Sequence, residues 1–397
     1  MKLDKDHYKT AVYPSPFHAK TSVLNETREF ERWHDYMSAT RYFDVSMEYF
    51  SCRNSTGVFD LTAMCKYRIT GVDALDYLNR LMTRDVSKIK VGRVGYGVWC
   101  DDAGQVVDDG TVFHIRDGEY WLCAQGRQYD WLLTSALGFD VVIEDISHQM
   151  TSLAVQGPTS CATLKAMGLA EIETLKPFGL RHYSIEDGEL TVSRTGFTGD
   201  LGYELWMKPE LAEPVWDALF AAGRLHGIKP MGERALAMAR LEAGFIQAWH
   251  DFLPADKAVR TTHTRSPFEL DLHWLVDFKK PNFTGRRALL EEKRNGSRYR
   301  LARLDIDGNK PAHHAFVYNR QNKVIGIVTS AMWSPSAKAN IALASLDVPY
   351  GEPGDEYLVE IYYQRELAWN RVMAPCRVVK GAFFDPPRKK QTPPADC

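Results

Sequence analysis

Two adjacent aspartates interrupt a segment that otherwise favours a β-strand. Asp108 and Asp109 lie in GQVVDDGTVFHI, residues 104–115, which is rich in valine, phenylalanine and isoleucine. Aspartate is depleted in strands, whereas these apolar residues are enriched there. Because strand side chains alternate between two faces, the two carboxylates are expected on opposite faces. On this alternation, the face of Asp109 also carries Val107, Phe113 and Ile115.

A carboxylate on a largely apolar face needs a reason to be there. Burying it costs free energy unless it is paired or hydrogen-bonded, and such groups with perturbed pKa values cluster at functional sites. The sequence therefore predicts that at least one of Asp108 and Asp109 faces a half-buried site. The alternative is a bulge at Gly110 that lets both aspartates cap nearby backbone amides without any chemical role.

Several other catalytic motifs are absent from the chain. It contains no Gly-x-x-x-x-Gly-Lys-Ser/Thr loop, no His-Glu-x-x-His and no Gly-x-Ser-x-Gly, the patterns of nucleotide, zinc and serine-hydrolase sites. The glycines of GRVGYG, residues 92–97, have the wrong spacing for a dinucleotide fingerprint, and the histidines lack metal-ligand spacing. We therefore expect neither a metal nor a nucleotide phosphate in the mechanism.

Composition sets the broad class of protein. The 397 residues are 45% hydrophobic and 25% charged, which is typical of a globular protein with more than one domain. A net charge of −2 gives no electrostatic case for nucleic acid or an anionic membrane. The chain begins MKLDKDHYKT without an apolar signal region, and its seven cysteines form no Cys-x-x-Cys pair. These features indicate a cytoplasmic protein in a reducing compartment.

The chain mixes helical and strand patterns before it becomes rich in β-strands. GVDALDYLNRLMTRDV, residues 71–86, predicts a helix, and residues 94–125 predict a strand meander with a tight turn at Asp117–Gly118. Short β-rich runs after about residue 298 predict a separate barrel or sandwich. The tail, residues 385–397, is rich in proline and charge, which predicts disorder.

A series of motifs in one order resembles a known family. They include GVFDLTAMCKYRITG, GQVVDDGTVF, LAVQGPTS, SRTGFTGDLGYEL, GERALAMARLEAGF and FTGRRAL, and they extend over roughly residues 55–375. The chain resembles the folate-dependent one-carbon transferases that include the glycine-cleavage T-protein (aminomethyltransferase) and dimethylsulfoniopropionate demethylase. The resemblance implies an α+β fold, a three-domain ring around a central folate channel with a C-terminal β-barrel. Residues 1–297 would form two interleaved folate-binding domains and residues 298–384 the barrel.

The resemblance also implies roles for individual residues. Asp109 would lie beside N5 and N10 of tetrahydrofolate. Asp108, which strand alternation places on the other face, is expected to be structural and bonded to backbone amides. Gln125 replaces an asparagine that contacts the pterin in the family. An ideal hairpin would put Gln125 and Asp109 on opposite faces, so this pair requires a bulge near Gly110. Glu204, in TGFTGDLGYE, would bind the pterin, and Arg234 would hold a folate carboxylate or carbonyl.

Aromatic residues complete the implied folate pocket. Tyr96 matches an aromatic residue of that pocket, and Trp274 is a candidate for the channel wall. Phe197 replaces the tyrosine of the family signature, which keeps a stacking surface but loses a hydroxyl. Each of these three residues has an alternative role as a core aromatic. Glu204 and Arg234 could likewise be exposed residues of a strand and a helix.

Three functions are consistent with these residues. The first is a tetrahydrofolate-dependent demethylase that takes a methyl group from a small-molecule donor: a sulfonium, a quaternary ammonium or a methyl ether. The second is an aminomethyltransferase of the T-protein type, with a lipoyl carrier protein as partner. The third is a folate-binding protein without transfer activity. Phe197 and the long segment AWHDFLPADKAVRTTHTRSPFEL, residues 248–270, favour the first.

Overall fold

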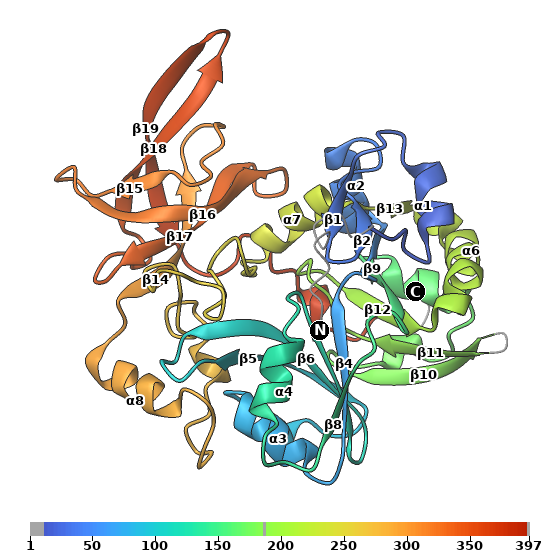
Figure 1. Cartoon of the computed structure of the whole chain (residues 1–397). Helices are drawn as coiled ribbons and strands as arrows, with labels where there is room; N and C mark the ends of the chain where they lie inside the picture. Colours follow the sequence, from blue (N-terminus) through green and yellow to red (C-terminus); the bar gives the residue numbers. More distant parts are fainter. Residues whose placement is uncertain (1–11, 186–187, 395–397) are drawn as a thin grey trace, which may run out of the picture. The chain divides into compact units, whose positions relative to one another are not determined.

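The chain folds into two compact units that both mix helices and strands. The computed structural model describes residues 12–185 and 188–394 (Figure 1). The first unit comprises residues 12–66, 145–237 and 387–394, and the second comprises 67–144 and 238–386. The predicted α+β class is confirmed. Within the described residues, no helix is long and apolar enough to cross a membrane.

A six-stranded sheet forms the centre of the first unit. Its strand order is β10 (Leu180–Ile185), β11 (Gly188–Ser193), β12 (Gly202–Met207), β9 (Thr151–Gln156), β3 (Thr56–Asp60) and β13 (Ile228–Pro230). The accompanying helices are α1 (His18–Leu24), α2 (Val45–Asn54), α5 (Ser160–Ala166), α6 (Ala212–Gly223) and the start of α7 (Glu233–Glu242). Tyr203 and Leu205 of β12 belong to a core that includes residues of α5 and α6. Because side chains alternate along β12, Glu204 lies on the opposite face of the sheet.

An N-terminal hairpin and a C-terminal segment complete this unit. The hairpin pairs β1 (Phe30–Trp33) with β2 (Tyr36–Ala39). The short 3₁₀ helix Pro387–Lys389 brings Arg388 to Asp200, and its Nε and Nη2 atoms donate to the two carboxylate oxygens at 2.6 and 2.7 Å. The Asp200 side chain is fully buried and also lies 3.8 Å from Arg53.

This contact differs from the disorder expected for residues 385–397. A buried carboxylate is costly unless cations and hydrogen bonds compensate it. Arg388 provides that compensation for Asp200, and this interaction orders the segment around it. Residues 395–397 lie outside the described residues.

A five-stranded sheet in the second unit carries the aspartate strand. Its order is β5 (Arg93–Cys100), β6 (Val106–Arg116), β7 (Glu119–Ala124), β4 (Cys65–Thr70) and β8 (Val142–Asp145), with helices α3 (Ala74–Leu81) and α4 (Tyr129–Ser135). Arg116 pairs with Glu119, and Gly118 has φ of 72°. The predicted tight turn at Asp117–Gly118 is therefore confirmed, because glycine adopts this left-handed conformation without strain.

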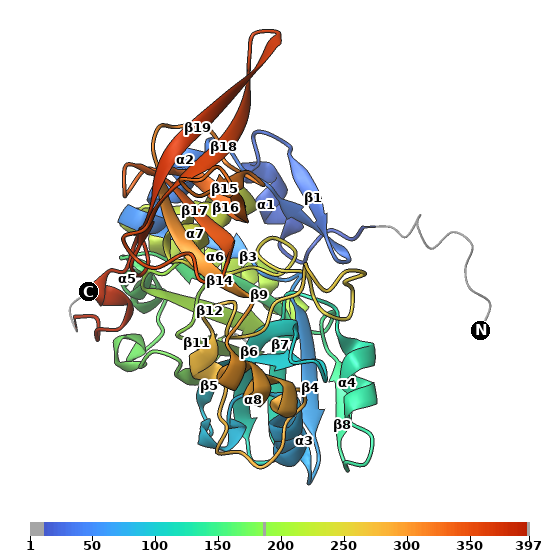
Figure 2. The same cartoon turned by 90° about the vertical axis from the view of Figure 1, so that its left-hand side faces the viewer.

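A closed β-barrel forms the C-terminal part of the second unit. Its strands, in order, are β14 (Tyr299–Ile306), β17 (Ala339–Asp347), β16 (Val324–Ser334), β15 (Phe316–Tyr318), β18 (Glu356–Arg365) and β19 (Ala368–Val379). Helix α8 (Arg286–Asn295) precedes it. Figure 2 shows β18 and β19 as a long hairpin that extends beyond the other strands. The predicted C-terminal barrel is confirmed.

Candidate functional site

Asp108 is bonded to the backbone on both of its carboxylate oxygens. The side chain is fully buried. Its Oδ1 accepts the N–H of Asp109 at 2.9 Å, and its Oδ2 accepts the N–H of Gly126 at 3.1 Å. A Cβ at Gly126 would lie 2.6 Å from that Oδ2, so glycine is required for this approach. Asp108 thus ties β6 to the segment that follows β7, in agreement with the structural role expected for it.

The aspartate strand contains two bulges, but neither is at Gly110. The pairing shifts by one residue at Val107 against β5 and at Ile115 against β7. Gly110 is regularly paired with Gly97 and Ala124, and a Cβ there would lie 2.3 Å from the carbonyl oxygen of Cys123. The predicted bulge at Gly110 is therefore wrong. Simple alternation between Val107, Asp109 and Ile115 also fails, because each bulge interrupts it.

The bulge at Ile115 changes the register of the strand that leads to Gln125. The tight turn alone would set Gln125 opposite Gly110. The bulge shifts the register, so that Gly110 pairs with Ala124. β7 ends at Ala124, so Gln125 lies one residue beyond the last pair of this ladder. The strand does contain a bulge, at Ile115 instead of near Gly110, and the contact of Gln125 with the folate site stays a prediction.

Asp109 forms the centre of a small group of predicted residues in the second unit. The Tyr96 hydroxyl donates to Asp109 Oδ2 at 2.8 Å. The Trp274 ring, in the 3₁₀ helix His273–Leu275, lies 6.3 Å from the Tyr96 ring between centroids, and its side chain is 62% exposed. Burial raises the pKa of Asp109 to about 6, although the Tyr96 hydrogen bond opposes this. Close to neutral pH, this carboxyl can therefore both accept and release a proton.

The carboxyl group of Asp108 has a different environment from that of Asp109. Burial raises the pKa of Asp108 well above its usual range, and the charge of Asp109 raises it further, against the two backbone hydrogen bonds. Like charges this close disfavour simultaneous ionisation. The site therefore carries less negative charge than two exposed aspartates would.

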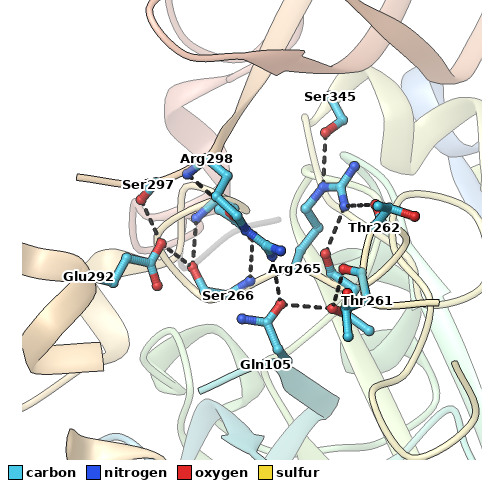
Figure 3. Close-up of polar contacts among 11 residues, drawn as sticks. Gln105, Thr261, Thr262, Arg265, Ser266, Glu292, Ser297, Arg298 and Ser345 are labelled. Carbon is cyan, nitrogen blue, oxygen red and sulfur yellow. Dashed lines mark hydrogen bonds and ion pairs between the residues drawn. The ribbon is translucent and has the colours of Figure 1, made fainter. Parts of the chain in front are cut away.

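A buried polar network fixes part of residues 248–270, the long segment that favours the demethylase function. Arg265 Nε donates to the hydroxyl of Ser345 at 2.9 Å, and its Nη1 donates to the carbonyls of Thr262 and Thr264 at 2.8 and 2.7 Å (Figure 3). The Thr264 hydroxyl donates to Gln105 at 2.8 Å. Residues 261–265 are thereby tied both to barrel strand β17 and to the turn that precedes β6.

Glu204 lies beside two hydroxyl groups in the first unit. Thr195 donates to its Oε2, and Ser193 donates to the same oxygen at 3.4 Å. Among the described residues, none donates a hydrogen bond to the other carboxylate oxygen of Glu204, Oε1. Burial raises the pKa of Glu204 to about 7, although both hydroxyls oppose this shift. A carboxylate with one oxygen still available can accept hydrogen bonds from a ligand.

The loop that joins β11 to β12 carries Phe197, and the side-chain amide of Gln156 forms hydrogen bonds with it. Gln156 Nε2 donates to the carbonyls of Thr195 and Tyr203 at 3.2 and 3.1 Å, and the Thr198 hydroxyl donates to its Oε1 at 2.9 Å. The Gln156 side chain is fully buried. Phe197 is partly exposed on this loop. The amide thus fixes both sides of the loop around Phe197.

Arg234 lies in the first turn of α7, where its side chain is 54% exposed. Its Nη2 is 3.6 Å from Oε2 of Glu29. The predicted site residues therefore divide between the units. Tyr96, Asp109, Gln125 and Trp274 lie in the second unit, and Phe197, Glu204 and Arg234 in the first.

Sequence reasoning did not identify several partners of these residues. Thr195 opens the TGFTGDLGYE motif, so its position could have suggested a contact with Glu204 at the end of the motif. The hydrogen bond from Tyr96 to Asp109 requires the register of β5 on β6, which residue types do not specify. Glu29 precedes every motif that carries the resemblance, so no sequence signal marked it.

Comparisons with known proteins agree with this fold. The GCVT N-terminal domain matches residues 16–280, and the glycine cleavage T-protein C-terminal barrel domain matches residues 300–385. The structure of the glycine cleavage system aminomethyltransferase T from Bartonella henselae covers 94% of this chain, and the match covers 99% of that chain. Its TM-score is 0.81 at 22% sequence identity, which establishes similarity of the fold.

Two curated relatives have different names. The chain is 36% identical over 356 residues to a trimethylamine-oxide aldolase of Ruegeria pomeroyi, a match that covers 86% of this chain and 43% of that protein. It is 32% identical over 326 residues to an aminomethyltransferase of Caldanaerobacter subterraneus, covering 81% of this chain and 85% of the relative. The chain thus spans less than half the length of the first relative and most of the second.

These matches define the class of protein as a folate-dependent one-carbon transferase. The chain belongs to the glycine cleavage T-protein family, as its motifs predicted. Tetrahydrofolate is the co-substrate of this family, and the expectation of a folate cofactor is therefore confirmed.

Proposed function

We propose that this protein is a tetrahydrofolate-dependent demethylase. It would move a methyl group from a small methylated donor, such as a sulfonium, a quaternary ammonium or a methyl ether, to N5 of tetrahydrofolate. The observation that carries the proposal is the group formed by Asp109, Tyr96 and Trp274. Aromatic faces attract methylated cations, and a carboxylate beside them adds a negative charge. This combination favours the cationic donors over the ether.

The named relatives support a methylated donor without deciding its identity. The relative with 36% identity is a trimethylamine-oxide aldolase, and its name specifies a methylated nitrogen compound. Several relatives with 28–32% identity are aminomethyltransferases, so an aminomethyltransferase reaction with a lipoyl carrier protein is the second candidate.

Asp109 would act as the base in methyl transfer. N5 attacks the methyl carbon, a bond from nitrogen to carbon forms, and the bond from carbon to sulfur or nitrogen of the donor breaks. The donor leaves with the electron pair of that bond as a neutral sulfide or amine. Positive charge develops on N5, and the ionised Asp109 carboxylate stabilises it and takes the N5 proton. Neither a metal nor a covalent enzyme intermediate is required.

The pH dependence of turnover should report the ionisation of Asp109. Since the base must be ionised and its pKa is raised to about 6, turnover should rise with pH below about 6 and level off above it. The slope should approach a factor of about ten per pH unit on the acidic side. Turnover at saturating substrate between pH 5 and 8, with unfolding temperatures recorded in the same buffers, checks this. A flat profile in stably folded protein would contradict the role.

Product analysis separates the two candidate reactions. Incubation with tetrahydrofolate and a panel comprising one sulfonium, one quaternary ammonium and one methyl ether should yield 5-methyltetrahydrofolate by mass spectrometry, without ammonia. A parallel incubation with an aminomethylated lipoyl carrier should give neither ammonia nor 5,10-methylenetetrahydrofolate. Ammonia release in the second incubation, with no methyl product in the first, would assign the aminomethyltransferase reaction instead.

A further inference from the structure

A second arginine lies beside Arg234 in the first unit. Glu29 directly precedes β1 and Arg41 is the second residue after β2, so the hairpin brings the two side chains together. Arg41 Nε donates to Glu29 Oε2 at 2.9 Å, and its Nη2 donates to Oε1. Arg234 Nη2 lies 3.6 Å from the same Oε2. Two arginines therefore share the Glu29 carboxylate, and the buried Glu48 carboxylate also lies close enough to act on the charge of Arg41.

Backbone contacts hold the two arginines next to each other. The N–H of Arg234 donates to the carbonyl of Thr40 at 3.1 Å. Gly232 packs closely against the same residues, because a Cβ there would lie 2.6 Å from Cα of Arg41. The buried Glu48 carboxylate accepts the N–H of Gly232 at 2.7 Å and that of Tyr42 at 2.7 Å. The spacing of the arginines is thus set by the fold and does not depend on their own ion pairs.

A row of paired residues leads across the sheet from Glu204 toward these arginines. Glu204 pairs with Ala154, and Ala154 pairs with Phe59. Directly opposed residues share a face, so the three side chains lie on the face opposite the helix-packed core. Pro230 of β13 pairs with Val58 in parallel, so the next residue, Met231, lies beside Phe59. This row covers three strand spacings, roughly 14 Å.

Aromatic rings lie between the ends of this row. The Phe59 ring is 6.1 Å from the Trp33 ring of β1, between centroids. The row thus leads from the Glu204 carboxylate, past the buried Phe59 ring and its Trp33 neighbour, toward the segments that carry the two arginines. Tetrahydrofolate has the matching order of chemical groups: a pterin rich in hydrogen-bond donors, a p-aminobenzoyl ring, and a glutamate with two carboxylates.

We infer that Arg41 and Arg234 together bind the glutamate tail of the folate, and that Glu29 occupies this position until the ligand displaces it. The inference rests on tetrahydrofolate as the acceptor in the proposed function. The resemblance assigns a folate contact to Arg234 alone, whereas Arg41 and Glu29 come from this chain's own N-terminal hairpin. Two-bond pairing with arginine is the geometry that a ligand carboxylate would adopt.

Displacement of Glu29 is energetically accessible. The side chains of Glu29, Arg41 and Arg234 are 37%, 35% and 54% exposed, and exposed ion pairs contribute little stability. The hydrogen bond from Arg41 lowers the pKa of Glu29. Glu29 is therefore ionised near neutral pH, where it competes with the carboxylates of the ligand.

The test measures binding with two ligands that differ only in the tail. Dissociation constants for tetrahydrofolate and for tetrahydropteroate, which lacks the glutamate, are measured by anaerobic titration calorimetry. Glu29→Gln should tighten tetrahydrofolate binding by about three- to tenfold, and Arg41→Ala should weaken it by a similar factor. Neither variant should change tetrahydropteroate binding. Added salt should weaken the binding of tetrahydrofolate more than that of tetrahydropteroate.

A matched ion pair elsewhere in the chain supplies the control. Arg68 and Glu144 pair with 42% and 41% exposure, and Arg68→Ala and Glu144→Gln should leave both dissociation constants unchanged. Unfolding temperatures of all variants identify any loss of folding. Unchanged tetrahydrofolate affinity in Glu29→Gln, or equal changes for the two ligands, would overturn the inference. Because the titrations contain no methyl donor, they test the binding of the tail alone. Tail-dependent binding combined with no methyl product from the donor panel would count against the proposed function alone.

Discussion

Replacing Asp109 by asparagine should lower turnover by roughly 10²-fold or more, the range seen when one acid–base or electrostatic group is lost. Asparagine keeps the shape of the side chain and can still accept the Tyr96 hydrogen bond, but it can neither take the N5 proton nor balance the developing charge. Folate affinity should change far less, because this interaction strengthens mainly in the transition state. Single-turnover rates and folate dissociation constants for the same preparation measure both effects.

Asp108→Asn is the matched control for that variant. Both carboxylate oxygens of Asp108 accept backbone N–H groups, and an amide can serve only one of them. The lost hydrogen bond should lower the free energy of unfolding by about 1–3 kcal/mol, while turnover per folded molecule is preserved. Near-normal turnover in Asp109→Asn, or abolished turnover in a well-folded Asp108→Asn protein, would show that the roles are assigned to the wrong residues.

Replacing Glu204 by glutamine should weaken folate binding by about 1–3 kcal/mol, the scale for losing a hydrogen bond to a charged group. The glutamine presents one acceptor and one donor to a pterin edge that offers donors. Because burial raises the pKa of Glu204 to about 7, wild-type affinity should rise with pH up to about 7 and then level off, since the ionised form is the acceptor. Calorimetric titrations between pH 6 and 8.5 measure this.

The glutamine variant should show neither the higher affinity nor this dependence on pH. Tetrahydropteroate should lose as much affinity as tetrahydrofolate, because the affected group is the pterin and not the tail. Equal dissociation constants for wild type and Glu204→Gln would remove Glu204 from the folate site.

Local features of the fold were predictable because they depend on neighbouring residues. The Asp117–Gly118 turn follows from the preference of glycine for a left-handed conformation, and the structure contains it. The bulges at Val107 and Ile115 have no such local signal, because they depend on how three strands fit together. For this reason the strand was predicted correctly, whereas the faces of some of its residues were not.

The candidate site was predictable only where a motif identified a residue. Asp109 and Glu204 belong to motifs that extend along the chain, but their hydrogen-bond partners come from other strands and loops. Glu29 and Arg41 precede the first motif, and their pairing depends on the hairpin register. Composition predicted disorder around Arg388. The prediction missed the contact of Arg388 with Asp200, because the burial of Asp200 cannot be read from residue types.

The ion pair between Arg388 and Asp200 also has a consequence for biosynthesis. The ribosome delivers Asp200 long before Arg388, which follows it by 188 residues. During translation, a nascent first unit would hold a buried Asp200 carboxylate that has Arg53 and the N–H of Leu201 beside it but still lacks Arg388. The final closure of this unit therefore waits until Arg388 has left the exit tunnel. Truncated products would be less stable and more exposed to cellular proteases.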